Sequence, residues 1–271
     1  MYRRNLRGNI LAALADSPVV LVNGARQAGK TTLVRDLGSR EHTARYITFD
    51  DVGFLSAARS DPAGFLSALA GPVILDEIQH APELFPAIKT AVDIDRTPGR
   101  YLLTGSANVM LLPRMSESLA GRMEIMTLWP LAQSEIENGP GGFVDSLFQG
   151  DAEPLPPWEG STTVEEDVAR RMLAGGFPEP LGRTSAARRG AWFRSYITTI
   201  LQRDIRDLAN LEGLTALPRL LSLTAARCST LLNSSDLARD SGLPYTTLHR
   251  YMSLLQSTYL VRLVPAWYRN L

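Results

Sequence analysis

The segment at residues 24–31, GARQAGKT, constrains the fold of this chain more than any other part of the sequence. It fits the pattern G-x-x-x-x-G-K-[ST], in which glycines let backbone N–H groups wrap around phosphate and the following helix presents its positive N-terminal end. Such a loop needs a strand before it and a helix after it. The apolar run at residues 18–22 predicts that strand, and the residues after Gly29 predict the helix. We therefore predict a nucleotide phosphate site.

Each polar residue of this loop has a distinct predicted role. Lys30 is expected to reach the β- and γ-phosphates of ATP, and the Thr31 hydroxyl is expected to ligate Mg²⁺. The lysine is informative because the chain has only two, Lys30 and Lys89, against 26 arginines. A compact ammonium fits the loop, whereas a planar guanidinium does not replace it. The predicted nucleotide-binding residues are Gly24, Ala25, Arg26, Gln27, Ala28, Gly29, Lys30, Thr31 and Thr32.

Five apolar segments alternate with helical patterns over residues 1–137, which predicts one α/β domain with a parallel sheet. Continuous apolar runs are typical of strands that are buried on both faces. Asp61 followed by Pro62 predicts a helix start, because aspartate caps helices and proline suits their first turn. The predicted strands lie at residues 18–22, 45–49, 72–75, 100–104 and 123–128, and helices, besides the one after the loop, at 61–69, 83–92 and 113–120.

An acidic pair follows the third predicted strand. The apolar run at residues 73–75 delivers Asp76 and Glu77 to the sheet edge where the phosphate loop lies. We expect Asp76 to hold Mg²⁺ through water, and Glu77 to act as the general base on the attacking water. An adjacent glutamate favours hydrolysis over binding alone. The alternative is a solvent-exposed acidic turn.

Polar residues also end the fourth predicted strand, in the sequence LLTGS at residues 102–106. A side chain at this strand end can orient water and contact the γ-phosphate. Ser106 is the first candidate for this catalytic role, followed by Thr104 and Asn108. The alternative is a turn that only ends the strand.

Two arginines have different predicted roles. Arg122 directly precedes the fifth predicted strand, where an arginine can stabilise transition-state charge, often in a neighbouring subunit's site. A purely structural arginine is the alternative there, because the chain contains 26 of them. Arg26 lies inside the loop, but we expect its side chain to point outward and to have a structural role.

The pattern changes after residue 137. Residues 138–163 contain GPGG and EPLPPWEG with little periodicity, which predicts a linker. Residues 164–230 predict a helical, lid-like domain, and residues 231–271 a truncated winged-helix-like module with a helix-turn-helix. The predicted helices lie at residues 164–174, 185–209, 214–227, 234–240 and 245–256, and a strand that would begin the wing lies at 259–264.

The charge distribution raises the question of DNA binding. Residues 1–164 carry 14 basic and 19 acidic residues and residues 165–271 carry 14 and 9, so the net charge of zero divides into −5 and +5. A basic helix-turn-helix can place its second helix in the major groove. That helix, however, carries only His249 and Arg250 as groups able to reach DNA. We therefore favour a packing module over a DNA reader.

The composition excludes several other classes of protein. One cysteine, Cys228, cannot form an internal disulfide, and three scattered histidines do not have metal-ligand spacing. No apolar run approaches the roughly 20 residues that span a bilayer. Near the start, the leucines and isoleucine at positions 6, 10, 11 and 14 share one face, which predicts an amphipathic helix rather than a signal peptide. We expect a cytoplasmic protein.

The order of these motifs resembles a bacterial and archaeal family of AAA-type ATP-binding proteins. The resemblance implies a five-stranded sheet of order 5-1-4-3-2, with the site at the carboxyl ends of the strands. Members carry a second, uncharacterised domain with a winged-helix-like part and a restriction-nuclease-like part. The motifs are GARQAGKTTL, FDD at 49–51, VILDEIQHAPELFPAIK at 73–89, LLTGSAN at 102–108, SESLAGR at 116–122, LWPLAQSE at 128–135, GGFPE at 175–179 and QRDI at 202–205.

Relatives in this family usually continue for roughly another hundred residues, a span of domain size. The nuclease-like part is therefore expected to be absent from this chain, and no nuclease activity is carried over to it.

Three functions are compatible with these residues. The first hypothesis is a Mg²⁺-dependent ATPase that couples ATP binding and hydrolysis to a conformational change of the helical domain. The second is a nucleic-acid-binding regulator in which ATP only sets the conformation. A small-molecule kinase is disfavoured, because an acidic pair followed by a polar strand end and an arginine fits hydrolysis better. Expected partners are ATP, with DNA, a second copy of the chain or another protein as candidates.

Overall fold

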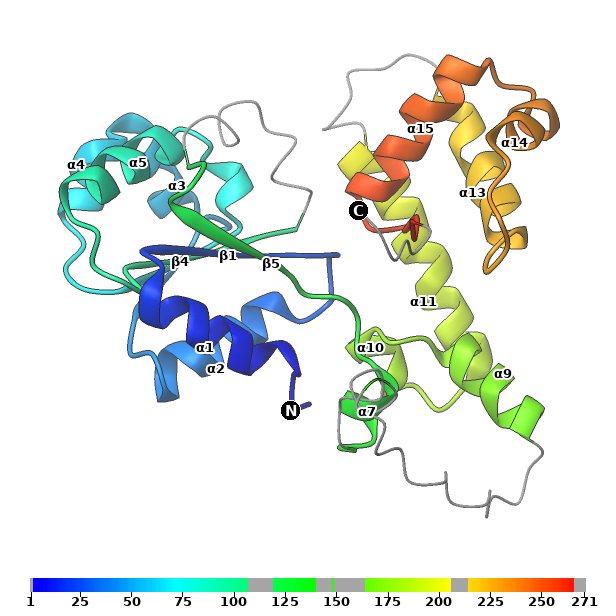
Figure 1. Ribbon diagram of the computed structural model, residues 1–271, viewed down its shortest axis with the longest axis horizontal. Coiled ribbons are helices and arrows are strands. Elements are labelled where there is room, and N and C mark those ends of the chain that lie inside the picture. Colours follow the sequence, from blue (N-terminus) through cyan, green and yellow to red (C-terminus); the bar gives the residue numbers. More distant parts are fainter. Residues whose placement is uncertain (1, 107–118, 140–147, 149–163, 206–213, 266–271) are drawn as a thin grey trace.

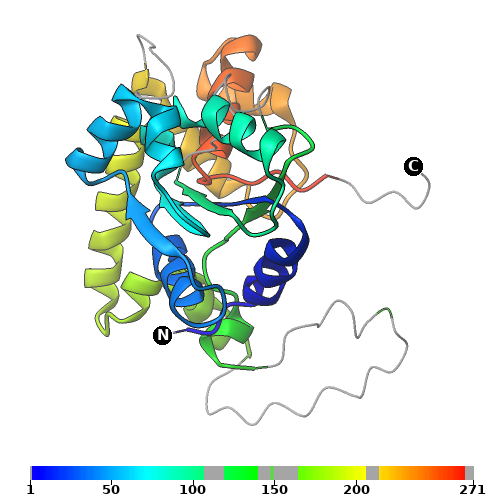
Figure 2. The same cartoon turned by 90° about the vertical axis from the view of Figure 1, so that its left-hand side faces the viewer.

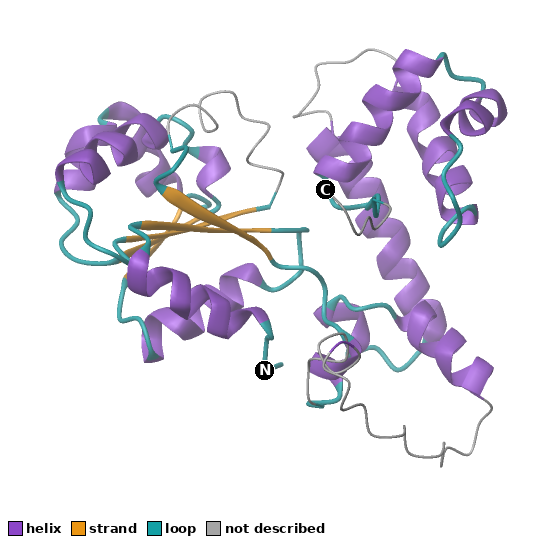
Figure 3. Cartoon of the chain, viewed as in Figure 1, coloured by secondary structure: helices purple, strands orange, loops and turns teal. Residues whose placement is uncertain are grey.

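The computed structural model describes residues 2–106, 119–139, 148, 164–205 and 214–265 (Figure 1). In these residues a parallel sheet lies between two layers of helices, and a set of helices follows to one side of it (Figure 3). This arrangement confirms the predicted class, an α/β P-loop domain followed by a helical region. Figure 2 views the molecule from the side of the sheet domain.

Five parallel strands form the sheet, in the order β2-β3-β4-β1-β5. This is the order 5-1-4-3-2 that the family resemblance implies, counted from the other edge. In the register, Asn23 at the end of β1 lies beside Gly105 of β4 and Thr127 of β5, so the strands end at a common edge. The strands are β1 (Val19–Asn23), β2 (Arg45–Thr48), β3 (Val73–Asp76), β4 (Tyr101–Gly105) and β5 (Met123–Thr127).

Helices cover both faces of this sheet. One face packs against α1 and α2 through residues such as Ile10 and Leu33, and the other packs against α4 and α5 through residues such as Leu66 and Ile88. Coverage on both faces explains why every residue of β1, β3 and β4 is buried. The helices are α1 (Leu6–Asp16), α2 (Lys30–Arg40), α3 (Val52–Ser60), α4 (Pro62–Ser67), the 3₁₀ turn η1 (Ile78–His80) and α5 (Leu84–Ile94).

Helix α3 is not among the predicted helices. Asp51 caps it by accepting hydrogen bonds from the N–H groups of Gly53 and Phe54, at 2.8 and 3.2 Å. Val52 and Gly53 are poor helix formers, so the local sequence does not indicate a helix start there. Asp61 caps α4 as expected. The predicted helix at residues 113–120 falls mostly on residues outside the described ranges.

The helical region is centred on α11 (Ala186–Thr199), which continues into the π-helix η3 (Ile200–Asp204). The sequence predicts one α-helix over residues 185–209; the structure instead places a π-helix at 200–204, and residues 206–209 lie outside the described ranges. The other elements are α7 (Gln133–Ile136), α9 (Val164–Ala174), α10 (Pro178–Leu181), the 3₁₀ turn η4 (Leu214–Ala216), α13 (Leu217–Ala226), α14 (Ser234–Ser241) and α15 (Tyr245–Ser257).

The two helices of the predicted helix-turn-helix are present as α14 and α15. Asn233 caps α14, and Gly242 ends it with a φ of +71°, a left-handed conformation that suits glycine. The predicted strand at residues 259–264 is wrong, since these residues form no strand. Instead, Tyr259 packs edge-on against Trp129 at 5.6 Å, and Arg262 lies over the same ring at 4.7 Å. The tail is therefore held by an aromatic side chain of the sheet domain rather than by strand pairing.

The helical region joins the sheet domain at a close backbone contact. The N–H of Leu131, shortly after β5, donates to the carbonyl of Gly176 at 2.7 Å. A Cβ atom at Gly176 would lie 2.3 Å from the carbonyl oxygen of Leu131. Glycine is therefore required at this position. The predicted linker at residues 138–163 falls almost entirely outside the described ranges.

We expect Gly176→Ala to lower the free energy of unfolding by about 1–3 kcal/mol, because the new methyl group must push two backbones apart. Thermal denaturation measures this. Gly182→Ala is the matched control, since its Cβ would lie 3.6 Å from the nearest atom, the carbonyl oxygen of Glu179. Equal melting temperatures for the two variants would contradict the contact at Gly176.

Candidate functional site

The phosphate loop lies between the last residue of β1 and the first residue of α2, and its backbone requires glycine twice. Gly24 has a φ of +145°, and a Cβ there would lie 2.2 Å from the carbonyl oxygen of Leu128. Gly29 has a φ of +97° and directly precedes α2. Both conformations are rarely adopted by residues with a side chain. The loop can therefore fold closely around a ligand at the N-terminus of α2.

Lys30 extends back along this loop. Its ammonium donates to the carbonyls of Gly24 and Ala25, at 2.9 and 3.0 Å. The residue is only 4% exposed. Burial lowers the pKa of Lys30 to about 8, although the nearby carboxylates of Glu77 and Asp76 oppose the shift. The site thus holds a positive charge with little water around it, which a phosphate group can neutralise.

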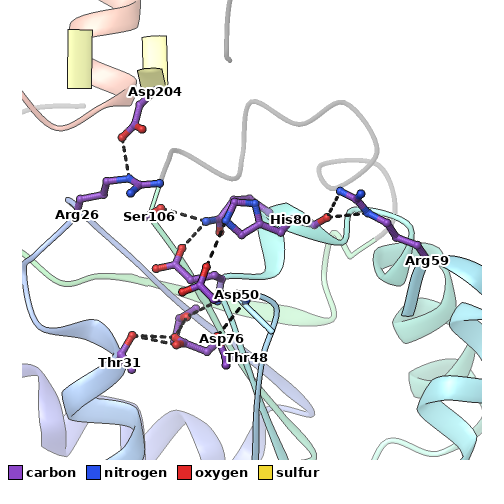
Figure 4. Close-up of polar contacts among 12 residues, drawn as sticks. Arg26, Thr31, Thr48, Asp50, Arg59, Asp76, His80, Ser106 and Asp204 are labelled. Carbon is purple, nitrogen blue, oxygen red and sulfur yellow. Dashed lines mark hydrogen bonds and ion pairs between the residues drawn. The ribbon is translucent and has the colours of Figure 1, made fainter. Parts of the chain in front are cut away.

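Asp76 ends β3 directly beside the loop, as the sequence predicts for an acidic residue at this strand end. Its carboxylate accepts hydrogen bonds from the Thr31 hydroxyl at 3.0 and 3.1 Å, from the Tyr46 hydroxyl at 2.6 Å, and from the Thr104 hydroxyl. Figure 4 shows Thr31 and Asp76 facing each other. Burial and the bond to Asp76 raise the pKa of Tyr46 to about 12. A hydroxyl and a carboxylate oxygen so close together fit the few protein ligands that Mg²⁺ takes beside phosphate.

Glu77 follows in a left-handed conformation, with a φ of +58°. Its N–H donates to the Thr104 hydroxyl at 3.0 Å, which fixes the turn after β3. Its carboxylate accepts a hydrogen bond from the amide nitrogen of Gln79, and the same nitrogen donates to the Ser106 hydroxyl at 3.1 Å. The structure therefore brings Ser106 and Thr104 to the acidic pair. Asn108 lies outside the described residues.

The cavity at this site has a volume of about 560 Å³. Glu77 lines it together with most of the loop, whereas Asp76 and Ser106 do not line it. Segments remote in sequence complete the wall, among them Tyr2, Pro178 and Glu179. Of the predicted nucleotide-binding residues, the cavity is lined by Arg26, Gln27, Gly29, Lys30, Thr31 and Thr32, and Gly24, Ala25 and Ala28 do not line it.

Arg26 points from the loop to the helical region. Its guanidinium pairs with Asp204 of η3 at 2.9 Å, and its backbone carbonyl accepts a hydrogen bond from the Tyr196 hydroxyl of α11 at 3.1 Å (Figure 4). Burial and the charge of Asp204 raise the pKa of Tyr196 well above its usual range. The phosphate loop is thus attached to the helical region through both the backbone and the side chain of one residue.

Arg4 supports the loop from the opposite side, and sequence reasoning did not identify it. Its guanidinium donates to the carbonyl of Ala28 at 2.8 Å and to that of Trp129 at 2.5 Å, and it pairs with the buried carboxylate of Glu135 at 3.3 Å. These partners lie up to 131 residues away, so no local pattern marks them. Tyr46 and Gln79 were missed for the same reason: Tyr46 bonds Asp76, and one of the two partners of Gln79 is Ser106, after the end of β4.

Arg122 is not brought to this site. It directly precedes β5, and Met123 pairs with Val19, the first residue of β1, so Arg122 lies at the end of the sheet away from the loop. Its guanidinium pairs with Asp93 of α5 at 2.5 Å. The proposed role of Arg122 in a neighbouring subunit's site stays a prediction.

The helix-turn-helix exposes Tyr245 and His249 of α15, whose rings lie 4.4 Å apart. DNA binding by this module also stays a prediction. Among the residues described, no group of three or more histidine, cysteine, aspartate or glutamate side chains is arranged to hold a metal ion. In the same part of the chain, no helix is both long and apolar enough to cross a membrane.

Comparison with known proteins divides the chain into two parts. Residues 16–137 match a family model described as an AAA domain, and residues 165–271 match one described as a domain of unknown function (DUF8612). The uncharacterized proteins Mb2031c of Mycobacterium bovis and Rv2008c of Mycobacterium tuberculosis are each 33% identical over 270 residues. The match covers 99% of this chain and 54% of each relative, so the chain spans about half the length of these relatives.

A solved structure has the same general fold. The Walker-type ATPase PABY2304 of Pyrococcus abyssi superposes with a TM-score of 0.52 over 95% of this chain and 90% of its own, at 16% sequence identity. At this identity the likeness concerns the fold alone.

Proposed function

We propose that the chain, whose residues 16–137 match a family model described as an AAA domain, binds ATP with Mg²⁺ and hydrolyses the γ-phosphate. We further propose that the state of the nucleotide changes the position of the helical region. The observation that carries the proposal is the placement of a buried ammonium and a carboxylate, those of Lys30 and Glu77, in the wall of one cavity that Thr31 also lines. The Thr31 hydroxyl is in turn bound to the Asp76 carboxylate.

The residues of the site have separate proposed roles in hydrolysis: phosphate binding, metal binding and proton transfer. Lys30 and the N–H groups of the loop bind the β- and γ-phosphates, and Thr31 and, through water, Asp76 would hold Mg²⁺. When bound, the ion would supply positive charge against the charge that develops on the phosphate oxygens. Glu77 lines the cavity next to these groups and takes the proton of the attacking water as general base.

The contacts of Arg26 supply a route from the nucleotide to the helical region. The loop must adjust when phosphate replaces the carbonyls that Lys30 now binds. Arg26 lies within that loop and is bound to Tyr196 and Asp204 of the helical region. An adjustment of the loop is therefore transmitted to α11 and η3 without an intervening element.

We expect Lys30→Ala to weaken ATP binding about 10- to 100-fold, because hydrogen bonds to charged groups contribute about 1.5–3 kcal/mol. Titration with a fluorescent ATP analogue measures the affinity. Lys89→Ala is the matched control, since it removes the only other lysine, which lies on α5 and does not line the cavity. Unchanged affinity in Lys30→Ala would show that the site is assigned wrongly.

For Glu77→Gln we expect hydrolysis to slow by about 10²- to 10⁴-fold, the usual contribution of a general base, while ATP still binds. Phosphate release in the presence of Mg²⁺ measures the rate, and EDTA should abolish it in the wild type. Glu124→Gln, at an exposed position of β5, is the control. A normal rate in Glu77→Gln would rule out its role as base.

Asp204→Asn tests the route to the helical region. The change removes the charge that pairs with Arg26 and keeps the volume, so we expect ATP affinity to stay within about fivefold of wild type, as for most partly exposed ion pairs. ATP should then alter hydrogen–deuterium exchange in residues 186–204 less than it does in wild type, because only the bond from Tyr196 to the Arg26 carbonyl remains. Asp236→Asn is the control, because it breaks a similar pair with Arg239 on α14. If ATP still protects residues 186–204 in Asp204→Asn as it does in wild type, this route is wrong.

A further inference from the structure

Gln79 occupies a rigid turn directly after the acidic pair. The turn η1 is closed by hydrogen bonds from His80 N–H to the Glu77 carbonyl at 3.0 Å and from Ala81 N–H to the Ile78 carbonyl at 2.9 Å. Ile78 is fully buried beneath it. Arg59 of α3 donates to the His80 carbonyl at 2.7 Å and anchors the turn from outside (Figure 4). The backbone of Gln79 is thus fixed relative to β3.

The side-chain amide of Gln79 makes two bonds through one atom. Its nitrogen donates to the Glu77 carboxylate and, at 3.1 Å, to the Ser106 hydroxyl. The opposite orientation of the amide would place an oxygen against the carboxylate, so the donor assignment follows from the chemistry. The amide oxygen is buried and has no hydrogen-bond partner among the described residues.

In the described part of the chain, the hydrogen bond from Gln79 is the one made to the Glu77 carboxylate. Among the described residues its backbone N–H is bound by Thr104, and the hydrogen bond to its side chain comes from Gln79. A glutamate side chain has three rotatable bonds, and fixing them costs entropy that a partner must offset. A base must lie within hydrogen-bond reach of its water, so an unheld carboxylate would be in the productive position only part of the time.

We propose that Gln79 is a positioning residue: it holds the Glu77 carboxylate toward the cavity by tying it to the Ser106 hydroxyl at the end of β4. The inference rests on the proposed ATPase function and extends it to a residue that does not touch the nucleotide. Because both bonds start from one nitrogen, the orientation of Glu77 depends on the position of Ser106. A shift of Ser106 at the end of β4 would therefore also shift the carboxylate of Glu77 after β3.

Steady-state hydrolysis of Mg²⁺-ATP by the full chain tests this role. We expect Gln79→Ala to lower kcat about 10- to 100-fold, the usual effect of losing a residue that orients a functional group, with KM and the affinity for a fluorescent ATP analogue unchanged. Gln79→Glu keeps the shape of the side chain but places an acceptor against Glu77, and it should lower kcat at least as much. Gln256→Ala, on α15, is the matched control and should retain the wild-type kcat.

A double-mutant cycle separates positioning from a general loss of structure. If Gln79 acts by linking Glu77 to Ser106, the effect of Gln79→Ala on kcat should be several-fold smaller in a Ser106→Ala background than in wild type. Equal effects in the two backgrounds would overturn the link, and a wild-type kcat in Gln79→Ala or Gln79→Glu would overturn the role itself.

The hydrolysis rates of Glu77→Gln and Gln79→Ala distinguish a failure of the positioning role from a failure of the proposed function. Slow hydrolysis by Glu77→Gln together with normal hydrolysis by Gln79→Ala rejects only the positioning role. Normal hydrolysis by Glu77→Gln rejects the base, and the inference about Gln79 falls with it.

Discussion

The buried carboxylate of Asp76 is the group on which the arrangement of the site depends. It is only 2% exposed, and a carboxylate in such a place is stable only when hydrogen bonds replace its lost water. Hydroxyl groups from α2, β2 and β4 supply those bonds, each worth about 1.5–3 kcal/mol because the acceptor is charged. The carboxylate therefore holds three neighbouring elements to one point. The donors are the hydroxyl groups of Thr31, Tyr46 and Thr104.

This constraint also places the groups that flank the bonded residues in sequence. Lys30 precedes Thr31, and Glu77 follows Asp76, so the bond between Thr31 and Asp76 brings an ammonium and a second carboxylate to the same cavity. Desolvation lowers the pKa of Lys30 to about 8, and the two carboxylates limit the shift. A guanidinium in this place would bring five donors into a space where the ammonium binds two carbonyls. The chain uses arginine almost everywhere else, but not here.

Local patterns were sufficient to predict the five strands and the loop, because apolar runs and glycine positions report burial and backbone conformation directly. The order of the strands came from the family resemblance. Local patterns were insufficient for Arg4, Tyr46 and Gln79, whose roles come from partners on other elements. Arg122 lies at the end of the sheet away from the loop of its own chain, so its predicted catalytic role would have to be in a neighbouring subunit's site and stays a prediction. The strand expected at 259–264 failed because a β-pattern does not supply a partner strand.

The π-helix after α11 explains how one helix reaches Arg26 twice. Tyr196 and Asp204 are eight residues apart, and in a regular α-helix their side chains would point about 80° away from each other. A π turn accommodates one extra residue, which reduces that angle to about 20°. Both side chains then face the phosphate loop, one at the backbone carbonyl of Arg26 and the other at its guanidinium. The π-helix thus allows a two-point contact that a straight α-helix could not make.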